Sequence, residues 1–212
     1  MKLKLLKRTI FNKVTLWFSY VKLIPILHKL NKDSIVIDCG ANIGDITKKF
    51  AGTGATVHAF EPDPLAFDLL KKRFEKTPNV ILYKKGVWNK ETDVILFGHK
   101  DQQNHELAYT IGSSIIGNKV NIDPEKKQTI HVIDLSDFIV NLGKKVNVIK
   151  LDVEGAETAI LRKILTDKTY NLFDKMYVET HETKIPGQSD ELKEIKEIIK
   201  QQNIQNIKLN WL

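Results

Sequence analysis

The sequence contains very little cysteine, glycine and proline. Cys39 is the only cysteine among the 212 residues, which excludes an intrachain disulfide and a metal site built from several cysteines, and which is typical of a protein in a reducing cytoplasm. The 11 glycines and 6 prolines are too few for collagen or for a low-complexity disordered chain. With 42% hydrophobic and 28% charged residues, the composition is typical of a single globular domain.

Acidic residues are absent from the first 32 positions. The chain has 33 Lys and Arg against 26 Asp and Glu, which gives a net charge of +7. Residues 1–32 carry a charge of +8, from Lys2, Lys4, Lys7, Arg8, Lys13, Lys22, Lys29 and Lys32. The rest of the chain therefore sums to −1 (+7 less +8). An electrostatic argument for binding nucleic acid is consequently limited to this N-terminal arm.

The arm has the periodicity of an amphipathic helix. Its apolar residues recur at intervals of three and four, at Leu3, Leu6, Ile10, Val14, Trp17, Val21 and Ile24. We expect the helix to end near Pro25, because proline disfavours a helix interior. Lys13 and Lys22 interrupt the apolar stretch and no small-residue cleavage site follows, so the arm is read neither as a transmembrane span nor as a signal peptide.

These patterns divide the chain into an arm, residues 1–32, and one domain, residues 33–212. Two positions for the arm stay open. Its apolar stripe packs against the domain, which we favour because the stripe is as wide as that of an ordinary core-facing helix. Alternatively, the arm lies on an anionic membrane surface with Phe11, Trp17 and Phe18 as anchors. The expected location is cytoplasmic, with peripheral membrane contact in the second case.

Beyond residue 33, short β-branched runs alternate with segments of helical periodicity. Strands are expected at 34–38, 56–60, 80–83, 146–151, 175–180 and 206–211, and helices at 45–51, 64–76, 135–142, 156–165 and 190–201. This alternation predicts an α/β fold, a mostly parallel, doubly wound sheet. Between residues 86 and 131 short strands at 94–97, 114–116 and 129–133 are separated by polar turns, which predicts a β-rich insert.

Two strand ends carry residues suited to a nucleoside cofactor. The dinucleotide fingerprint G-x-G-x-x-G is absent, because the first turn has the spacing Gly40-x-x-x-Gly44 with Asn42 between. Glu61 follows the second strand, where an acid can accept hydrogen bonds from both ribose hydroxyls. Asp38 would repel a pyrophosphate but can help to hold an ammonium group. S-adenosylmethionine has a ribose and an ammonium and no phosphate, so it fits better than NAD; an ordinary strand–turn–helix with a capping acid is the alternative.

Three segments in order resemble the FkbM family of S-adenosylmethionine-dependent methyltransferases. They are Asp38-Cys39-Gly40-Ala41-Asn42-Ile43-Gly44, then Glu61-Pro62, then Lys150-Leu151-Asp152-Val153-Glu154-Gly155-Ala156-Glu157. The resemblance covers about residues 34–182. It implies the class I methyltransferase (Rossmann-like) fold with a seven-strand sheet. It also implies methyl transfer to a hydroxyl oxygen of a sugar, glycan or small metabolite.

The resemblance also implies which residues contact S-adenosylmethionine. By the family pattern these are Asp38, Gly40, Ala41, Asn42, Gly44, Glu61, Pro62, Gly86, Val87 and Asp152. Trp88, Ser113 and Ser114 lie where the family approaches adenine or substrate. Only one strand follows the last helix, whereas the full fold closes with an antiparallel pair. We therefore expect a shortened C-terminal sheet edge.

An alcohol acceptor must lose its proton during or after methyl transfer, so a nearby base is useful. His181 directly follows a strand and is flanked by Glu179 and Glu182, which can orient it or raise its pKa. A surface-loop histidine is the alternative. Asp152 and Glu154 form a second catalytic candidate.

Asp152 and Glu154 could also bind Mg²⁺ together with Glu182. This would give a metal-assisted methyl transfer, an alternative that we do not favour. For Glu157 we expect a role at the start of helix 156–165. His58 is expected to be a core histidine, and Asp134 and Asp137 are expected to cap a helix. His99 and His105 receive no role.

Two other function classes stay open. A nucleic-acid methyltransferase recruited by the basic arm is disfavoured because Asp152-Val153-Glu154-Gly155 stands where base-amine enzymes commonly have an Asn/Asp-Pro-Pro-aromatic motif. The second open class is a cofactor-binding module without catalytic activity. Partners are therefore expected to be small molecules or glycans.

Overall fold

The computed structural model describes residues 23–100, 112–120 and 122–209. Most of the predicted arm helix, including its apolar residues from Leu3 to Val21, lies outside the described residues. So do His105 in the insert and residues 210–212 at the end of the chain.

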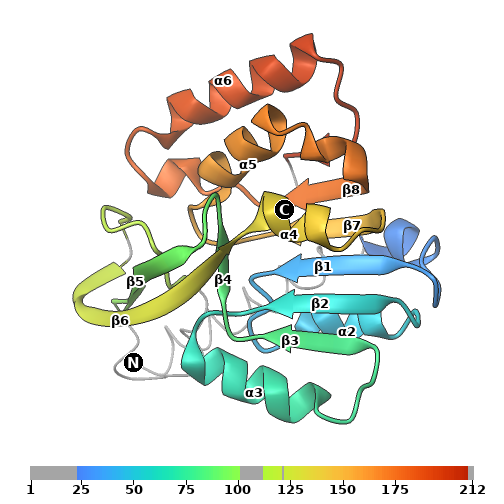
Figure 1. Cartoon of the computed structure of the whole chain (residues 1–212). Coiled ribbons are helices and arrows are strands. Elements are labelled where there is room, and N and C mark those ends of the chain that lie inside the picture. Colours follow the sequence, from blue (N-terminus) through green and yellow to red (C-terminus); the bar gives the residue numbers. More distant parts are fainter. Residues whose placement is uncertain (1–22, 101–111, 121, 210–212) are drawn as a thin grey trace.

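The central sheet is parallel throughout and has six strands in the order β3-β2-β1-β7-β8-β9 (Figure 1). In chain order the strands are β1 (Ile35–Cys39), β2 (Thr56–Phe60), β3 (Val80–Tyr83), β7 (Val146–Leu151), β8 (Phe173–Val178) and β9 (Ile207–Lys208). β1 pairs with β2 on one side and with β7 on the other. The strand order therefore reverses between β1 and β7, where ligands bind in open α/β sheets, beyond the carboxyl ends of the strands.

Helices cover both faces of this sheet, as the alternating pattern predicted. In chain order they are α2 (Asp45–Ala51), α3 (Pro64–Phe74), α4 (Leu135–Asn141), α5 (Glu157–Thr166) and α6 (Gln188–Gln201), with short 3-10 helices η2 (Thr169–Leu172) and η3 (Glu182–Lys184). Ile37 and Ile149 pack with α4 and α5 on one face. Val36 and Val148 belong to a separate cluster with Phe50 of α2 on the other. Adjacent strand residues point to opposite faces, so one pair of strands contributes to both clusters.

The insert forms a second, three-stranded sheet in the order β4-β6-β5. Its strands are β4 (Gly86–Trp88), β5 (Thr92–His99) and β6 (Ile122–Asp134), and β5 and β6 are antiparallel. The predicted β-rich insert is confirmed, but its boundaries were wrong. Residues 86–88 form a strand, residues 114–116 do not, and Ser114 makes only an isolated bridge to Phe97. β6 starts at Ile122, well before residue 129. The sequence did not predict this earlier start, because the first half of β6 is an exposed polar ribbon without apolar alternation.

The C-terminal edge of the sheet is short, as expected. β9 has two residues, and Ile207 pairs with Met176 in parallel. The seven-strand sheet implied by the family resemblance is not found in the described part of the chain, which contains six strands in this sheet and ends with a parallel one.

The end of the N-terminal arm is part of the folded body. Residues 23–27 are helical, so the helix continues past Pro25, and the N–H of His28 donates to the carbonyl of Ile24. Leu23, Ile26 and Leu30 are buried against the cluster that contains Phe50. Ile24, expected on the apolar stripe, is 39% exposed instead. The register of the stripe was therefore wrong at this end of the helix.

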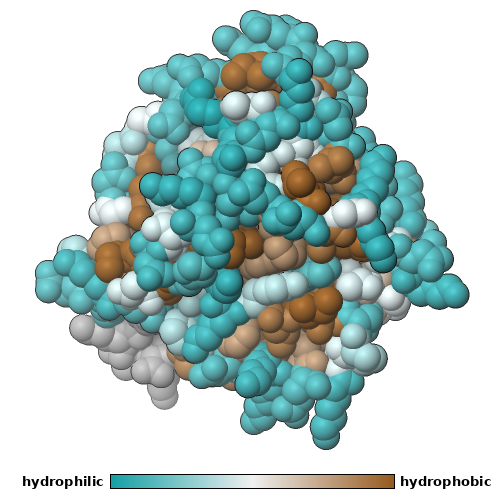
Figure 2. Space-filling view, viewed as in Figure 1, coloured by the Kyte–Doolittle hydropathy of each residue, from teal (hydrophilic) through white to brown (hydrophobic). Residues whose placement is uncertain are grey.

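The surface seen in Figure 2 is mostly hydrophilic, with apolar side chains in several separate patches. The exposed large apolar residues of the described chain come from different elements: Ile24, Ile81, Ile95, Val120, Val140 and Leu172. Among the described residues, no helix combines the length and the apolar character that crossing a membrane requires.

The burial of the arm's last turn gives a stability prediction with a neighbouring control. Leu23→Ala, at a side chain with 0% exposure, should lower the free energy of unfolding by about 2–5 kcal/mol, because it leaves a cavity in the core. Ile24→Ala should cost less than about 1 kcal/mol. Urea unfolding monitored by circular dichroism measures both. Equal losses would contradict this packing of the arm.

Candidate cofactor and catalytic site

The turn after β1 has the backbone shape that its glycines predicted. Gly40, Asn42 and Gly44 all have positive φ, at 76°, 49° and 86°. A Cβ on Gly40 would overlap the backbone carbonyl oxygen of Asp152, and one on Gly44 would meet Phe74 of α3. The turn is therefore closely packed between the end of β7 and the helix that follows β2, and no larger residue fits at either glycine. Asn42 adopts the left-handed conformation that the sequence suggested.

Glu61, at the end of β2, connects the second strand to this turn. One carboxylate oxygen accepts the N–H of Asn42 at 2.8 Å, and the other accepts the N–H of Asp63 at 2.8 Å. Burial raises the pKa of Glu61 to about 7, although both backbone N–H groups and Lys150 act in the opposite direction. Each carboxylate oxygen keeps a further lone pair, so the side chain can still accept hydrogen bonds from two hydroxyl groups of a ligand.

Asp38 is fully buried at the end of β1. Its Oδ2 accepts a hydrogen bond from the Thr47 hydroxyl at 2.7 Å, and its Oδ1 lies 3.4 Å from the Lys150 ammonium. Oδ1 has no hydrogen-bond partner among the described residues. A buried carboxylate oxygen without a hydrogen bond is costly, so this atom is suited to a donor group supplied by a ligand.

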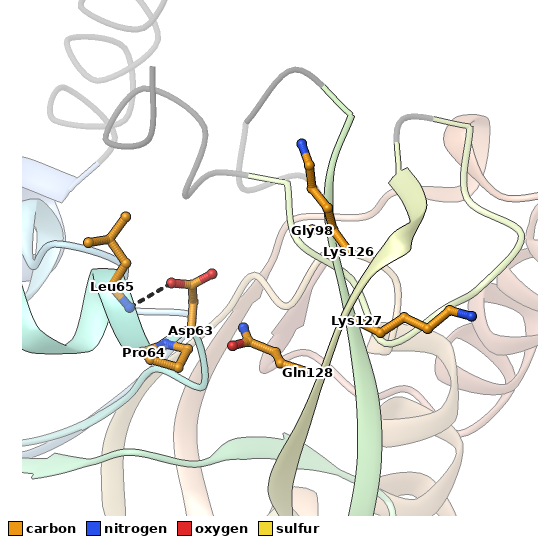
Figure 3. A pocket seen from close by; sticks show the side chains of 7 residues that line it. All are labelled: Asp63, Pro64, Leu65, Gly98, Lys126, Lys127 and Gln128. Carbon is orange, nitrogen blue, oxygen red and sulfur yellow. Dashed lines mark hydrogen bonds between the residues drawn. The ribbon is translucent and has the colours of Figure 1, made fainter. Parts of the chain in front are cut away.

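Gly86 lies beside Pro62, whereas Val87 is buried in the core. Val87 packs in the main core cluster, and a Cβ on Gly86 would lie 3.6 Å from Pro62. A cavity of about 280 Å³ opens next to this region, between the first turn of α3 and the insert. It is lined by Asp63, Pro64, Leu65, Gly98, Lys126, Lys127 and Gln128 (Figure 3). Asp63 caps α3 by accepting the N–H groups of Leu65 and Ala66, so one wall is rigid.

His181 lies in a buried cluster of acids at the ends of β7 and β8. Its Nδ1 is 2.9 Å from Glu157, and its Nε2 is 3.2 Å from Glu154. Glu179 and Asp152 are farther, at 3.8 and 3.9 Å from Nε2. Burial alone would lower the pKa of His181, but the hydrogen bond to Glu157 and the neighbouring carboxylates raise it to about 9. The imidazole is therefore protonated at neutral pH.

This arrangement corrects two expectations for His181. It is neither a surface-loop histidine, since its side chain is 2% exposed, nor a group that titrates near neutrality. The acids in closest contact with it are Glu157 and Glu154 rather than the flanking Glu179 and Glu182. Glu157 is in the first turn of α5, as predicted, but its carboxylate also accepts the Val153 N–H and faces His181.

The insert reaches this cluster through residues 112–120. Lys119, which is buried, forms an ion pair with Glu154 and donates to the carbonyl of Gly112. The hydroxyl of Ser114 donates to the backbone carbonyl of Glu154 at 2.7 Å. Burial raises the pKa of Glu154, but His181 and Lys119 outweigh it and the pKa lies below its ordinary value. The family resemblance implied that Ser114 lies near adenine or substrate, whereas no pattern in the sequence indicated a role for Lys119.

Two carboxylates of the cluster remain accessible from outside. The side chains of Asp152 and Glu179 are 26% and 25% exposed. Burial raises the pKa of both, and that of Glu179 is about 7. A hydroxyl-bearing molecule at this edge of the sheet would meet these two groups.

The proposed Mg²⁺ set is not assembled. Asp152, Glu154 and Glu182 do not form a compact group of oxygen atoms among the described residues; the group within 4.8 Å is Asp152, Glu157 and His181. A histidine binds a metal through a neutral ring nitrogen, whereas both ring nitrogens of His181 are in contact with carboxylates, Nδ1 with Glu157 and Nε2 with Glu154. We assign no metal there.

Two other sequence expectations are confirmed. The side chain of His58 is buried and its Nδ1 lies 2.9 Å from the Tyr83 hydroxyl. Asp134 is the N-cap of α4 and accepts the N–H of Asp137. These residues have structural roles and lie apart from the acidic cluster.

The buried charges of the site give a pH-dependent stability. The pKa of His181 is about 9 in the folded protein against an ordinary value of 6.5. Its contribution to stability is therefore fully present below pH 6.5 and is lost as the pH rises through 9. We expect the free energy of unfolding to fall over this range, with a slope of at most about 1.4 kcal/mol per pH unit from this one group. His181→Gln should flatten the curve, and urea titrations at successive pH values measure it. An equally steep fall in the variant would contradict this assignment.

A family model described as the methyltransferase FkbM domain matches residues 38–205. "Methyltransferase 1" of Beauveria bassiana is 29% identical over 166 residues, which cover 72% of this chain and 66% of that protein. The hexuronic acid methyltransferase AglP of Haloferax volcanii is 29% identical over 139 residues, 65% of this chain and 52% of that one. The chain thus spans between half and two thirds of the length of these relatives.

Solved structures show a more distant likeness. A methyltransferase FkbM from Methylobacillus flagellatus is 19% identical with a TM-score of 0.41, covering 66% of this chain and 32% of that chain. An rRNA methylase from Streptococcus thermophilus is 14% identical with a TM-score of 0.41, covering 79% and 71%.

Proposed function

Because the chain belongs to the FkbM methyltransferase family, we propose that it transfers a methyl group from S-adenosylmethionine to a hydroxyl oxygen of a sugar, glycan or small metabolite. The observation that carries this proposal is the joint geometry of the turn Gly40–Gly44 and Glu61 at the point where the strand order reverses. Hexuronic acid methylation is stated for the relative AglP, which supports a saccharide as the acceptor class.

The residues present fit S-adenosylmethionine. Glu61 offers two carboxylate oxygens for the ribose hydroxyls. Oδ1 of Asp38, which accepts no hydrogen bond although it lies 3.4 Å from the Lys150 ammonium, is suited to an ammonium donor. Gly40 and Gly44 give the turn its left-handed backbone positions, with Ala41 and Asn42 between them. Pro62, Gly86 and Val87 are proposed to lie near the base, and the cavity that begins at Asp63, next to Pro62, is the space available on this side.

Charge balance at this edge also favours S-adenosylmethionine over a phosphate-bearing cofactor. Carboxylates outnumber cations there, since Lys150, Lys119 and His181 face Asp38, Glu61, Asp152, Glu154, Glu157 and Glu179. Glu61 and Glu179, with pKa values of about 7, are partly ionised at neutral pH, so the excess is smaller than the number of carboxylates alone gives. An excess of negative charge attracts a sulfonium and repels a pyrophosphate. When bound, the cofactor supplies an electrophilic methyl group on a positively charged sulfur.

For the acceptor we propose the edge formed by Asp152 and Glu179. Their carboxylates are the accessible part of the acidic cluster, and each can accept a hydrogen bond from a hydroxyl group. With a pKa of about 7, Glu179 can take up a proton at neutral pH. His181, already protonated, acts in this proposal as a cation that orients Glu154 and the neighbouring carboxylates. Its role as the base, proposed from sequence, requires a pH above about 9.

The first experiment measures the affinity for the cofactor. Isothermal calorimetry should detect S-adenosylmethionine binding to the full chain. Glu61→Ala should weaken it by about 1.5–3 kcal/mol, the range for hydrogen bonds to a charged group. Glu75→Ala, at an exposed acid after α3, should leave the affinity unchanged. Unaltered affinity in a folded Glu61→Ala protein would contradict the ribose assignment.

Methyl-labelled S-adenosylmethionine, incubated with the protein and fractionated cell extract, should label the saccharide or small-molecule pool. Label in the nucleic-acid pool would support the methyltransferase recruited by the basic arm instead. Binding without any transfer would support a module without catalytic activity.

For the arm we propose contact with an anionic membrane surface through residues 1–22, which carry most of its positive charge. Each Lys or Arg near the headgroups adds up to about 1 kcal/mol. Full-length protein should therefore co-sediment with phosphatidylserine vesicles, and a Lys4→Glu, Arg8→Glu variant should lose most of this binding. A Lys71→Glu, Lys72→Glu control on α3 should not. Equal binding by all three proteins would exclude a role for the arm.

A further inference from the structure

Lys150 is a charged residue in the middle of the buried sheet. It belongs to β7, between strands β1 and β8, and it is 4% exposed. In the parallel register it lies directly opposite Asp38 of β1. Burying an isolated ammonium is expensive, so a lysine at this position needs partners.

The partners of Lys150 all lie at the reversal of the strand order. Its Nζ donates to the carbonyl of Gly40 at 2.8 Å and lies 3.4 Å from the carbonyl of Cys39. The same atom is 3.4 Å from Asp38 and 3.3 Å from Asp152. Three of these four contacts are made with the end of β1 and the turn that follows it. The fourth is made with the end of the strand that Lys150 itself belongs to.

These contacts decide the shape and charge of the turn. Gly40 has no space for a side chain because the Asp152 carbonyl packs against it, and its own carbonyl accepts a hydrogen bond from Lys150. Asp38 and Asp152 are two carboxylates near one another, and the single ammonium between them offsets one negative charge. Burial alone would lower the pKa of Lys150, but Asp152, Asp38 and Glu179 raise it above its ordinary value. The ammonium therefore stays charged.

We propose that Lys150 is the positioning residue of the cofactor site: it holds the Gly40 carbonyl and keeps Asp38 and Asp152 together with one net negative charge, which remains for the cationic end of S-adenosylmethionine. This inference rests on the proposed function. Lys150 acts through the turn and the two carboxylates rather than by contact with the methyl group.

Three substitutions separate the charge of Lys150 from its hydrogen bond. Lys150→Met removes both, Lys150→Gln keeps an N–H donor without charge, and Lys150→Arg keeps both. Isothermal calorimetry with S-adenosylmethionine and with S-adenosylhomocysteine measures the affinities. Lys150→Met should bind both at least tenfold more weakly, Lys150→Gln should be intermediate, and Lys150→Arg should recover most of the affinity. Rescue by the conservative variant is a result that loss of core packing would not produce.

Lys175→Met is the matched control, because Lys175 lies on the neighbouring strand β8 and also donates to a backbone carbonyl, that of Gln205. It should bind the cofactor normally. Thermal melting without ligand checks that each variant is folded, and Lys150→Gln and Lys150→Arg provide the test if Lys150→Met does not fold.

The inference is overturned if a folded Lys150→Met or Lys150→Gln protein binds within threefold of the unsubstituted chain, or if folded Lys150→Arg is no better than the neutral variants. Failure of the unsubstituted chain to bind either ligand overturns the proposed function instead.

Discussion

The close pairing of β1 with β7 is the constraint on which the rest of the site depends. These strands come from distant parts of the chain, and their parallel register places Asp38 opposite Lys150. The N–H of Asp152 donates to the carbonyl of Cys39 just beyond the paired residues. At the same point Gly40 packs against the Asp152 carbonyl. The strand order reverses here, where ligands bind in open α/β sheets, and the ion-paired ends of β1 and β7 meet at this point.

The acidic cluster at the neighbouring strand ends has a different physical basis. His181 is surrounded by carboxylates from the β7–α5 connection, from α5 and from its own segment after β8. Buried charges of one sign would repel one another, so the cluster depends on its ion pairs with His181 and Lys119. Glu154 has a left-handed backbone with φ of 58°, which is costly for a residue other than glycine. Its contacts with Lys119, His181 and Ser114 hold it in this conformation.

The insert contributes to the site although it forms a separate sheet. Residues 112–120 place Ser114 and Lys119 on Glu154, and the β5–β6 ribbon forms one wall of the cavity beside α3. An acceptor bound near Asp152 and Glu179 would therefore meet the insert as well as the main sheet. Substitutions in the insert could change which acceptor is bound while the turn after β1 stays the same, because loops tolerate substitution more readily than the elements that support them.

Local patterns in the sequence determined the α/β alternation, most strand positions and the cofactor turn. Helix α2 and strands β2, β3 and β7 have the bounds expected from periodicity alone, since fully buried strands and amphipathic helices have strong local signals. The left-handed position of Asn42 and the capping by Asp134 also follow from the chemistry of single residues. Lys150 had a detectable signal as well, because a lysine within an apolar strand needs a buried partner.

Only the tertiary structure decided which charged residues meet. Sequence neighbours suggested Glu179 and Glu182 for His181, but the closest contacts come from Glu157 and Glu154 across a strand connection. Lys119 had no signal, because its partner lies 35 residues away and is brought to it by the folding of the insert. The exposed ribbon of β6 and the burial of Leu23 rather than Ile24 likewise depend on what packs against them. Local sequence determines the elements and their turns, whereas ion pairs and protonation states depend on distances between segments that only the folded chain brings together.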